Sequence, residues 1–107
     1  MLGAQIINMK TIEKIELRPE YVETIPDVSL MEERVLYISR EYNVAIHKCL
    51  CGCGNQAVTP FKIGEEPNKW WNLTESDKGV TLKPSILNTN CPNRYHYIIT
   101  NSVANVV

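Results

Sequence analysis

The chain has 107 residues, of which 44% are hydrophobic and 21% charged, and its formal net charge is −1. This length suits a single domain spanning residues 1–107 with one modest core, and the balanced charge gives no electrostatic basis for binding nucleic acid or an anionic membrane. No apolar run approaches the roughly 20 residues that cross a bilayer, and the first residues lack the pattern of a secretory signal. We therefore expect a cytoplasmic protein, in which cysteines serve as metal ligands or reactive thiols rather than as disulfides.

The first half of the chain is predicted to form strands. Residues 11–17 alternate apolar and polar side chains, and the Arg-Pro pair at 18–19 is expected to end this strand. An irregular stretch follows, with a single helical turn at 26–30. The β-branched and aromatic residues at 34–39 indicate a second strand. Residues 44–50 indicate a third, and the short polar stretch before it suits a hairpin turn.

The second half of the chain continues the same pattern. A turn is predicted at 77–79 and a long loop at 84–94. Trp70 and Trp71 would alternate faces, so that one is in the core and the other exposed. No helical period extends beyond two turns, so the expected fold class is mainly β, a compact antiparallel sandwich or open barrel with little helix. The strands predicted here are 56–61, 69–74, 80–82, 95–100 and 103–107.

A cluster of soft metal ligands occupies the sequence HKCLCGCG. In a strand its alternate side chains would share a face but lie about 7 Å apart, too far for one zinc ion with bonds of about 2.0–2.3 Å to gather them all. Gly52 and Gly54 permit positive φ angles, so we expect a strand that runs into a tight metal-binding loop. The candidate ligands in this cluster are His47, Cys49, Cys51 and Cys53.

The remaining cysteine and histidine of the chain, Cys91 and His96, lie together near its end. Every candidate ligand therefore falls in one of two short segments. Free cysteines can also be plain core residues, and a Cys-x-Cys pair can be a redox switch, but the two-segment arrangement favours metal binding, with zinc as the expected ion. The spacing is not the repeated CxxC of a zinc ribbon, so the kind of site stays open.

The number of ligands leaves two roles for the metal. A structural zinc has four protein ligands, whereas a catalytic zinc has three and keeps a position for water. Catalysis would also need a general base. Glu41 is the candidate, because it lies in the turn before the strand that carries His47, although a turn carboxylate can be merely solvated. Ser85 could hydrogen-bond a reacting oxygen or cap a turn.

Two long stretches, LYISREYNVAIHKCLCGCGNQAVTP and VTLKPSILNTNCPNRYHYIITNSV, resemble a small bacterial family. The family pattern combines HxCxCGCG, a PSI motif and HYxI, and its members occur beside genes for ubiquitin-like conjugation, with enzymes akin to E1 and E2. The resemblance covers residues 35–103. It implies a zinc-dependent peptidase that trims a ubiquitin-like protein at its C-terminal tail or releases it from targets. The alternative is a non-catalytic, zinc-stabilised protein-binding module of the same pathway.

The resemblance also assigns individual positions. If the protein is a zinc-dependent hydrolase, we expect Glu41 to take a proton from a metal-bound water. The chain departs from the family pattern at Asn93, where the family has a cysteine, and at Leu87, where it has a glycine; Cys91 lies two residues before Asn93 and could replace the missing thiolate. The positions that match the family motif are Glu41, His47, Cys49, Cys51, Cys53, Pro84, Ser85 and His96.

Overall fold

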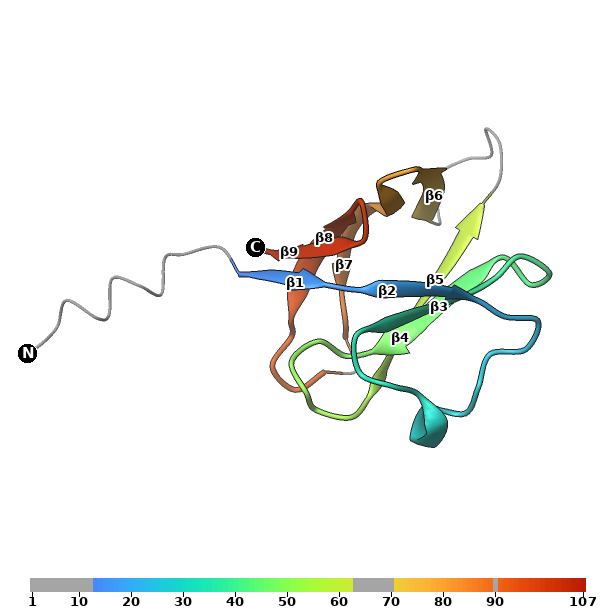
Figure 1. Cartoon of the computed structure of the whole chain (residues 1–107). Helices are drawn as coiled ribbons and strands as arrows, with labels where there is room; N and C mark the ends of the chain where they lie inside the picture. Colours follow the sequence, from blue (N-terminus) through green and yellow to red (C-terminus); the bar gives the residue numbers. More distant parts are fainter. Residues whose placement is uncertain (1–12, 63–70, 90) are drawn as a thin grey trace, which may run out of the picture.

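The structure, a computed structural model, describes residues 13–62, 71–89 and 91–107. Within these ranges nine strands form one sheet, in the order β1-β9-β8-β7-β6-β5-β4-β3-β2 (Figure 1). All neighbouring pairs are antiparallel except β2–β3 and β5–β6. The strands are β1 (Lys14–Glu16), β2 (Arg18–Tyr21), β3 (Val35–Ser39), β4 (Val44–Lys48), β5 (Gln56–Lys62), β6 (Trp71–Ser76), β7 (Gly79–Leu87), β8 (His96–Thr100) and β9 (Val103–Val106).

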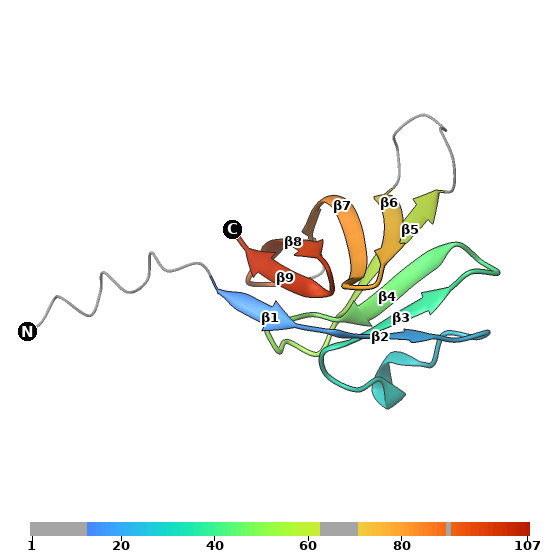
Figure 2. The same ribbon diagram turned by 45° about the horizontal axis from the view of Figure 1, so that its top comes forward.

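The sheet is curled into a nearly closed barrel, and its two outermost strands meet at Leu17, which we call the seam. β1 and β2 are the two outermost strands, yet they follow each other in the chain with Leu17 between them. The Leu17 N–H donates to the Ser102 carbonyl at 2.8 Å, whereas the next N–H, of Arg18, donates to the Arg34 carbonyl at 2.9 Å. The same short segment therefore pairs with both halves of the sheet (Figure 2). The predicted mainly β fold, with an open barrel as one of its forms, is confirmed.

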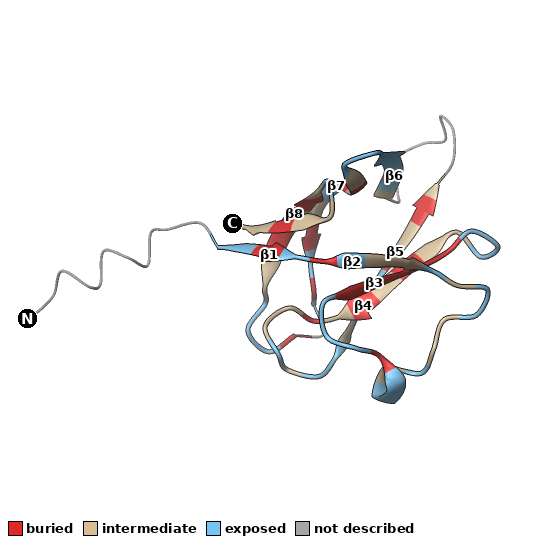
Figure 3. Ribbon diagram, viewed as in Figure 1, coloured by how far each residue is buried: buried red, intermediate tan, exposed pale blue. Residues whose placement is uncertain are grey.

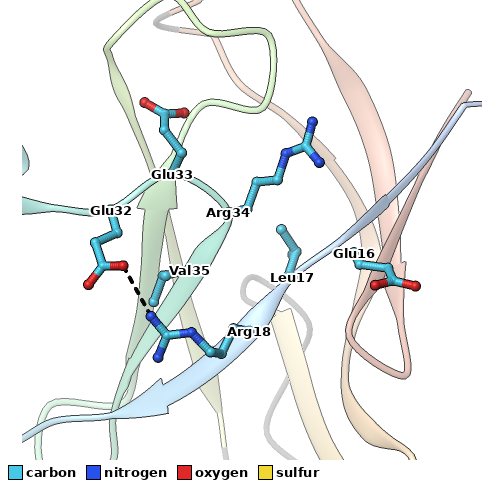
Figure 4. Close-up of a pocket in the computed structure, with 7 residues that line it drawn as sticks. All are labelled: Glu16, Leu17, Arg18, Glu32, Glu33, Arg34 and Val35. Carbon is cyan, nitrogen blue, oxygen red and sulfur yellow. Dashed lines mark hydrogen bonds and ion pairs between the residues drawn. The ribbon is translucent and has the colours of Figure 1, made fainter.

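A small pocket lies beside this seam, between the β1–β2 segment and the residues that lead into β3 (Figure 4). The Arg18 guanidinium reaches the Glu32 carboxylate at 3.2 Å and the Glu20 carboxylate at 2.9 Å. These groups are exposed, and exposed ion pairs contribute at most about 1 kcal/mol. Leu17 is buried, so the backbone hydrogen bonds and its apolar side chain stabilise the seam more than the charges do.

The core fills the inside of the barrel. β3 is buried along its whole length, whereas β4, β5 and β8 alternate between buried and less buried residues (Figure 3). This period of two is the one expected for strands with one face toward a core. The fully buried apolar residues of the main cluster are Leu36, Ile38, Ala45, Leu82, Tyr97, Ile99 and Ala104.

A separate strand, β2, runs through Pro19 to Tyr21, where the sequence had predicted the start of an irregular stretch. β2 pairs in parallel with β3 from Arg18 to Tyr21. Proline lacks the N–H that a central strand needs, but β2 is the last strand in the sheet order and has only one neighbour. The first strand does end before Arg18, as predicted, but the irregular stretch expected after it begins only beyond Tyr21.

The expected helical turn is present as a short 3-10 helix, Val28–Leu30, whose N-cap Asp27 accepts a hydrogen bond from the Ser29 N–H at 3.1 Å. In the ranges that the structure describes, no helix has the length and apolar character needed to cross a membrane. Residues 11–12 and 69–70, the first residues of two predicted strands, lie outside the described residues, and so does Trp70.

Two turns dock against each other at one end of the barrel. Asn101 and Ser102, between β8 and β9, both have positive φ, 51° and 65°, as in a two-residue hairpin turn of type I′. Ser102 donates its N–H to the Val80 carbonyl at 2.8 Å, and its Oγ accepts from the Val80 N–H at 3.0 Å. Gly79, just before Val80, has a φ of 133°. This contact joins the β8–β9 turn to the start of β7.

Candidate active site and metal centre

A serine and a histidine lie in hydrogen-bonding contact on the outer side of the sheet. Ser85, in β7, and His96, the first residue of β8, are joined by 2.8 Å between Oγ and Nε2. Leu87 is opposite His96 in the antiparallel ladder. Because residues two apart on a strand share a face, Ser85 is a diagonal neighbour of His96. An imidazole in this position can accept the hydroxyl proton and make the oxygen a nucleophile.

A bulge in β7, between Leu82 and Ile86, determines where Ser85 lies. The sequence had predicted a strand that stops at Leu82 and a loop from 84, but β7 continues to Leu87. Its register against β8 shifts between Leu82 and Ile86, where β7 has three residues and β8 has one. Bulges of this kind re-aim side chains and are frequent next to active sites. The indole N–H of Trp71 donates to the Ser85 carbonyl at 3.3 Å and so supports this segment from the β6 side.

Four cysteines meet where two loops lie together at one end of the barrel (Figure 1). Three are in the loop between β4 and β5, and Cys91 is in the loop between β7 and β8. Their sulfur atoms all lie within 4.8 Å of one another, with 3.1 Å between Cys51 and Cys91. Gly52 and Gly54 have φ angles of 88° and 90°, so the glycines bend the loop as predicted. The four members are Cys49, Cys51, Cys53 and Cys91.

The surroundings of the sulfur atoms favour a thiolate at Cys91, whereas burial raises the pKa of the Cys49 thiol to about 12. Burial raises the pKa of the Cys91 thiol, but hydrogen bonds from the backbone N–H groups of Tyr95 and Asn93 and from Cys51 outweigh this and lower its pKa to about 6. The Asn93 side-chain amide also donates to the sulfur of Cys51 at 3.5 Å. Four sulfurs at this spacing, with backbone N–H donors at Cys91, match the donor set of a tetrahedral metal site.

His47 lies apart from this group. It is completely buried, and its Nε2 is 2.5 Å from the hydroxyl oxygen of Tyr97. Burial lowers the pKa of His47 to about 4, so the imidazole is neutral at neutral pH. Its Nδ1 has no hydrogen-bond partner within the described part of the chain. The structure thus places His47 in the core, outside the group of four sulfurs, with Tyr97 as its hydrogen-bond partner.

The other predicted site residues are distributed as follows. His96 is hydrogen-bonded to Ser85 and is not one of the residues grouped with the four sulfurs. Glu41 is exposed in the turn between β3 and β4 and is also outside that group. The six expected ligands therefore separate into four cysteines that come together and two histidines that each contact a hydroxyl group. Cys91 takes a place among the sulfurs, and Asn93 lies beside them as a donor.

A serine hydroxyl that contacts an imidazole on a rigid strand is the arrangement typical of serine hydrolases. The comparison with protein families agrees with this class. Residues 21–107 match the family described as bacterial ubiquitination-like system serine protease (BubE), and because the match covers most of the chain, the protein belongs to this family. No curated protein and no solved structure is detectably similar to the chain.

The family corrects the mechanism expected from the sequence. A zinc-dependent peptidase, in which Glu41 takes a proton from a metal-bound water, is wrong, because the family is one of serine proteases. The expectation arose because His96 was counted among the metal ligands, so Ser85 was considered only as a group that hydrogen-bonds a reacting oxygen or caps a turn, and not as a nucleophile. A serine and a histidine at opposite ends of one predicted loop were the signal that could have indicated the pair.

Proposed function

We propose that this protein is a serine hydrolase that cleaves the bond following the C-terminal tail of a bacterial ubiquitin-like protein, with Ser85 as nucleophile and His96 as general base. The observation that carries the proposal is the 2.8 Å contact between Ser85 Oγ and His96 Nε2. The family description, which combines a serine protease with a ubiquitination-like system, supports both the chemistry and the kind of partner. E1- and E2-like enzymes of the same system would be further partners.

The reaction follows from the positions of the two side chains. As Ser85 Oγ attacks the carbonyl carbon of the scissile bond, His96 Nε2 accepts the hydroxyl proton. His96 then donates this proton to the leaving amine or alcohol, and an ester joins Ser85 to the tail. A water molecule, deprotonated by His96, attacks the ester, releases the tail as a carboxylic acid and restores the Ser85 hydroxyl.

We further propose that the four cysteines hold one zinc ion in a structural role. A zinc ion with four thiolate ligands has a closed shell with no position for water, so it would join the two loops instead of activating water. Cys91 lies in the loop whose two ends lead to Ser85 and His96. Fixing this loop would keep the two catalytic groups at hydrogen-bonding distance.

The nucleophile can be tested directly. A fluorophosphonate probe should label the protein once, on the peptide that contains Ser85, as followed by mass spectrometry. Ser85→Ala should abolish labelling and reduce cleavage of a ubiquitin-like protein with a C-terminal extension by about 10⁴-fold. Ser76→Ala, a serine exposed on β6, is the matched control and should behave as the unaltered protein. Full cleavage by Ser85→Ala would remove Ser85 from the mechanism.

The role of the metal needs a separate measurement. Protein purified without a metal-affinity tag should contain about one zinc per chain, and Cys91→Ser should lower this content. Prolonged chelation should reduce both labelling of Ser85 and thermal stability, because the loop would lose its anchor. A protein without bound metal that keeps full labelling and an unchanged melting temperature would contradict the structural role and leave the serine mechanism intact.

A further inference from the structure

The sheet has an opening beside Ser85, because β6 does not extend along the whole length of its two neighbours. β6 is paired with β5 only at Phe61 and Lys62, and its pairing with β7 ends at Lys83. In the described part of the chain, no strand pairs with the β6 side of residues 56–60 in β5 or of residues 84–87 in β7. Among the described residues, these two stretches are therefore strand edges without a strand partner, and they border the same opening.

The hydrogen bonds that are present show which backbone groups of β5 face this opening. The Phe61 N–H donates to the Asn43 carbonyl at 2.9 Å, so the backbone groups of Phe61 point toward β4. In an antiparallel ladder the direction alternates from residue to residue. The N–H and C=O groups of Gln56 and Val58 therefore point the opposite way, toward the opening.

The backbone groups of β7, on the other side of the opening, alternate in the same way. The Asn88 N–H donates to the Tyr95 carbonyl at 3.2 Å. The backbone N–H and C=O groups of Asn88 and Ile86 therefore point toward β8, and those of the residues between and before them point away. Ser85 and Leu87 thus direct their backbone groups at the opening. The Trp71 indole supports this direction, since it reaches the Ser85 carbonyl from the β6 side at 3.3 Å.

Apolar side chains flank the opening on the outer face of the sheet. Val58 is 43% exposed and Leu87 is 41% exposed, and they are two of the few large apolar side chains on the described surface. The pairing of Phe61 with Trp71 limits the opening at one end. The four cysteines limit it at the other, because they join the loop before β5 to the loop after β7. Only a narrow, extended segment of about four residues fits such a stretch.

We propose that these edges receive the extended C-terminal tail of a ubiquitin-like protein as an additional strand beside β7, with Val58 and Leu87 in contact with its side chains. The inference rests on the proposed function. Backbone pairing with the exposed edge of a sheet is a common way to bind extended peptides. Because the nucleophile lies on this edge, a tail paired with Ser85 and Leu87 would present its own carbonyl group to the Ser85 hydroxyl.

The test compares peptides that differ only in one backbone group. The probe is a fluorogenic ester of an eight-residue peptide with the C-terminal sequence of a ubiquitin-like protein from such a system, and the variants carry a single N-methyl group at successive positions. Methylation removes one donor and blocks close strand pairing, so alternate positions should lose about tenfold in kcat/KM, mainly through KM. The positions between them should lose less, because their amides would point away from β7, whose edge carries the nucleophile, and toward β5.

Side-chain variants test whether the apolar residues beside the opening contact the bound peptide. Val58→Asp should lower kcat/KM for the peptide ester by about tenfold, whereas Tyr42→Asp, a change at an exposed residue in the β3–β4 turn, should not. Melting temperatures show that both variants are folded. If fluorophosphonate labels Ser85 but all N-methylated peptides react alike, the added strand is refuted and the proposed function stands. If Ser85 is not labelled at all, the proposed function fails and the tail-binding inference fails with it.

Discussion

Replacing Gly79 by alanine should strongly destabilise the barrel. The φ of 133° at this position is in a region that residues with a Cβ rarely occupy, and a Cβ atom would lie 2.7 Å from the carbonyl carbon of Asn101 and 2.5 Å from Ser102 Oγ. Strain at such a φ costs about 1–3 kcal/mol, and displacing packed groups costs about 1–3 kcal/mol more. We therefore expect the free energy of unfolding to fall by about 4 kcal/mol.

The assay is urea unfolding followed by tryptophan fluorescence, together with a thermal melt, in which Gly79→Ala should lower the melting temperature by about 15 °C or more. Gly54→Ala is the control that separates the two costs. Gly54 also has a positive φ, 90°, but its Cβ would meet no atom within 4 Å, so only the strain remains. Equal destabilisation by the two substitutions would refute the argument that the contact with the β8–β9 turn determines the loss.

Further predictions concern the buried polar pair and the site. Tyr97→Phe removes the hydroxyl that contacts His47 Nε2, so the free energy of unfolding, measured in urea, should fall by about 1–3 kcal/mol. Unchanged stability would mean that this contact contributes nothing. The pKa of His47 is about 4 in the folded protein and about 6.5 when unfolded. The unfolded state therefore binds more protons between these values, and about 3 kcal/mol of stability, complete above pH 6.5, should be lost as the pH falls to 4. This loss should be smaller in His47→Gln, and an identical pH profile would assign it to other groups. Trp71→Phe should reduce kcat/KM about tenfold with little loss of stability, because the Ser85 carbonyl loses its donor; an unchanged kcat/KM would show that Trp71 does not position Ser85.

The strand pattern was predictable because it depends on local signals. The β-branched and aromatic residues of β3 and the alternation in β4 and β8 were each recognisable, and the structure has strands at these places. The two parallel pairs and the continuation of β2 after Pro19 were not, since they depend on which strand lies at the edge of the sheet. No local property of Arg18 or Pro19 indicates that β2 has a single neighbour.

The site was predictable in part for the same reason. Cysteine spacing and two glycines were enough to expect a bent loop that meets Cys91. The contact between Ser85 and His96 was not expected, because it requires β7 to continue as a bulged strand through Pro84 to Leu87. A histidine near cysteines also has the same appearance in a sequence whether it binds a metal, a serine hydroxyl or a buried tyrosine. Only the three-dimensional neighbours of His47 and His96 distinguish these cases.

The seam at Leu17 has a consequence for how the barrel forms during synthesis. β1 leaves the ribosome before every other strand of the sheet, yet its partner is β9, and Lys14 pairs with Asn105. β2, directly after β1, can pair with β3 once a short further stretch of chain has been made, since Arg18 pairs with Val35. The nascent chain can therefore assemble the β2–β5 half while β1 has no strand to join. Closure of the barrel depends on contacts between the most distant described parts of the chain, which are slow to form, so β1 stays an open edge until the last strand has been made.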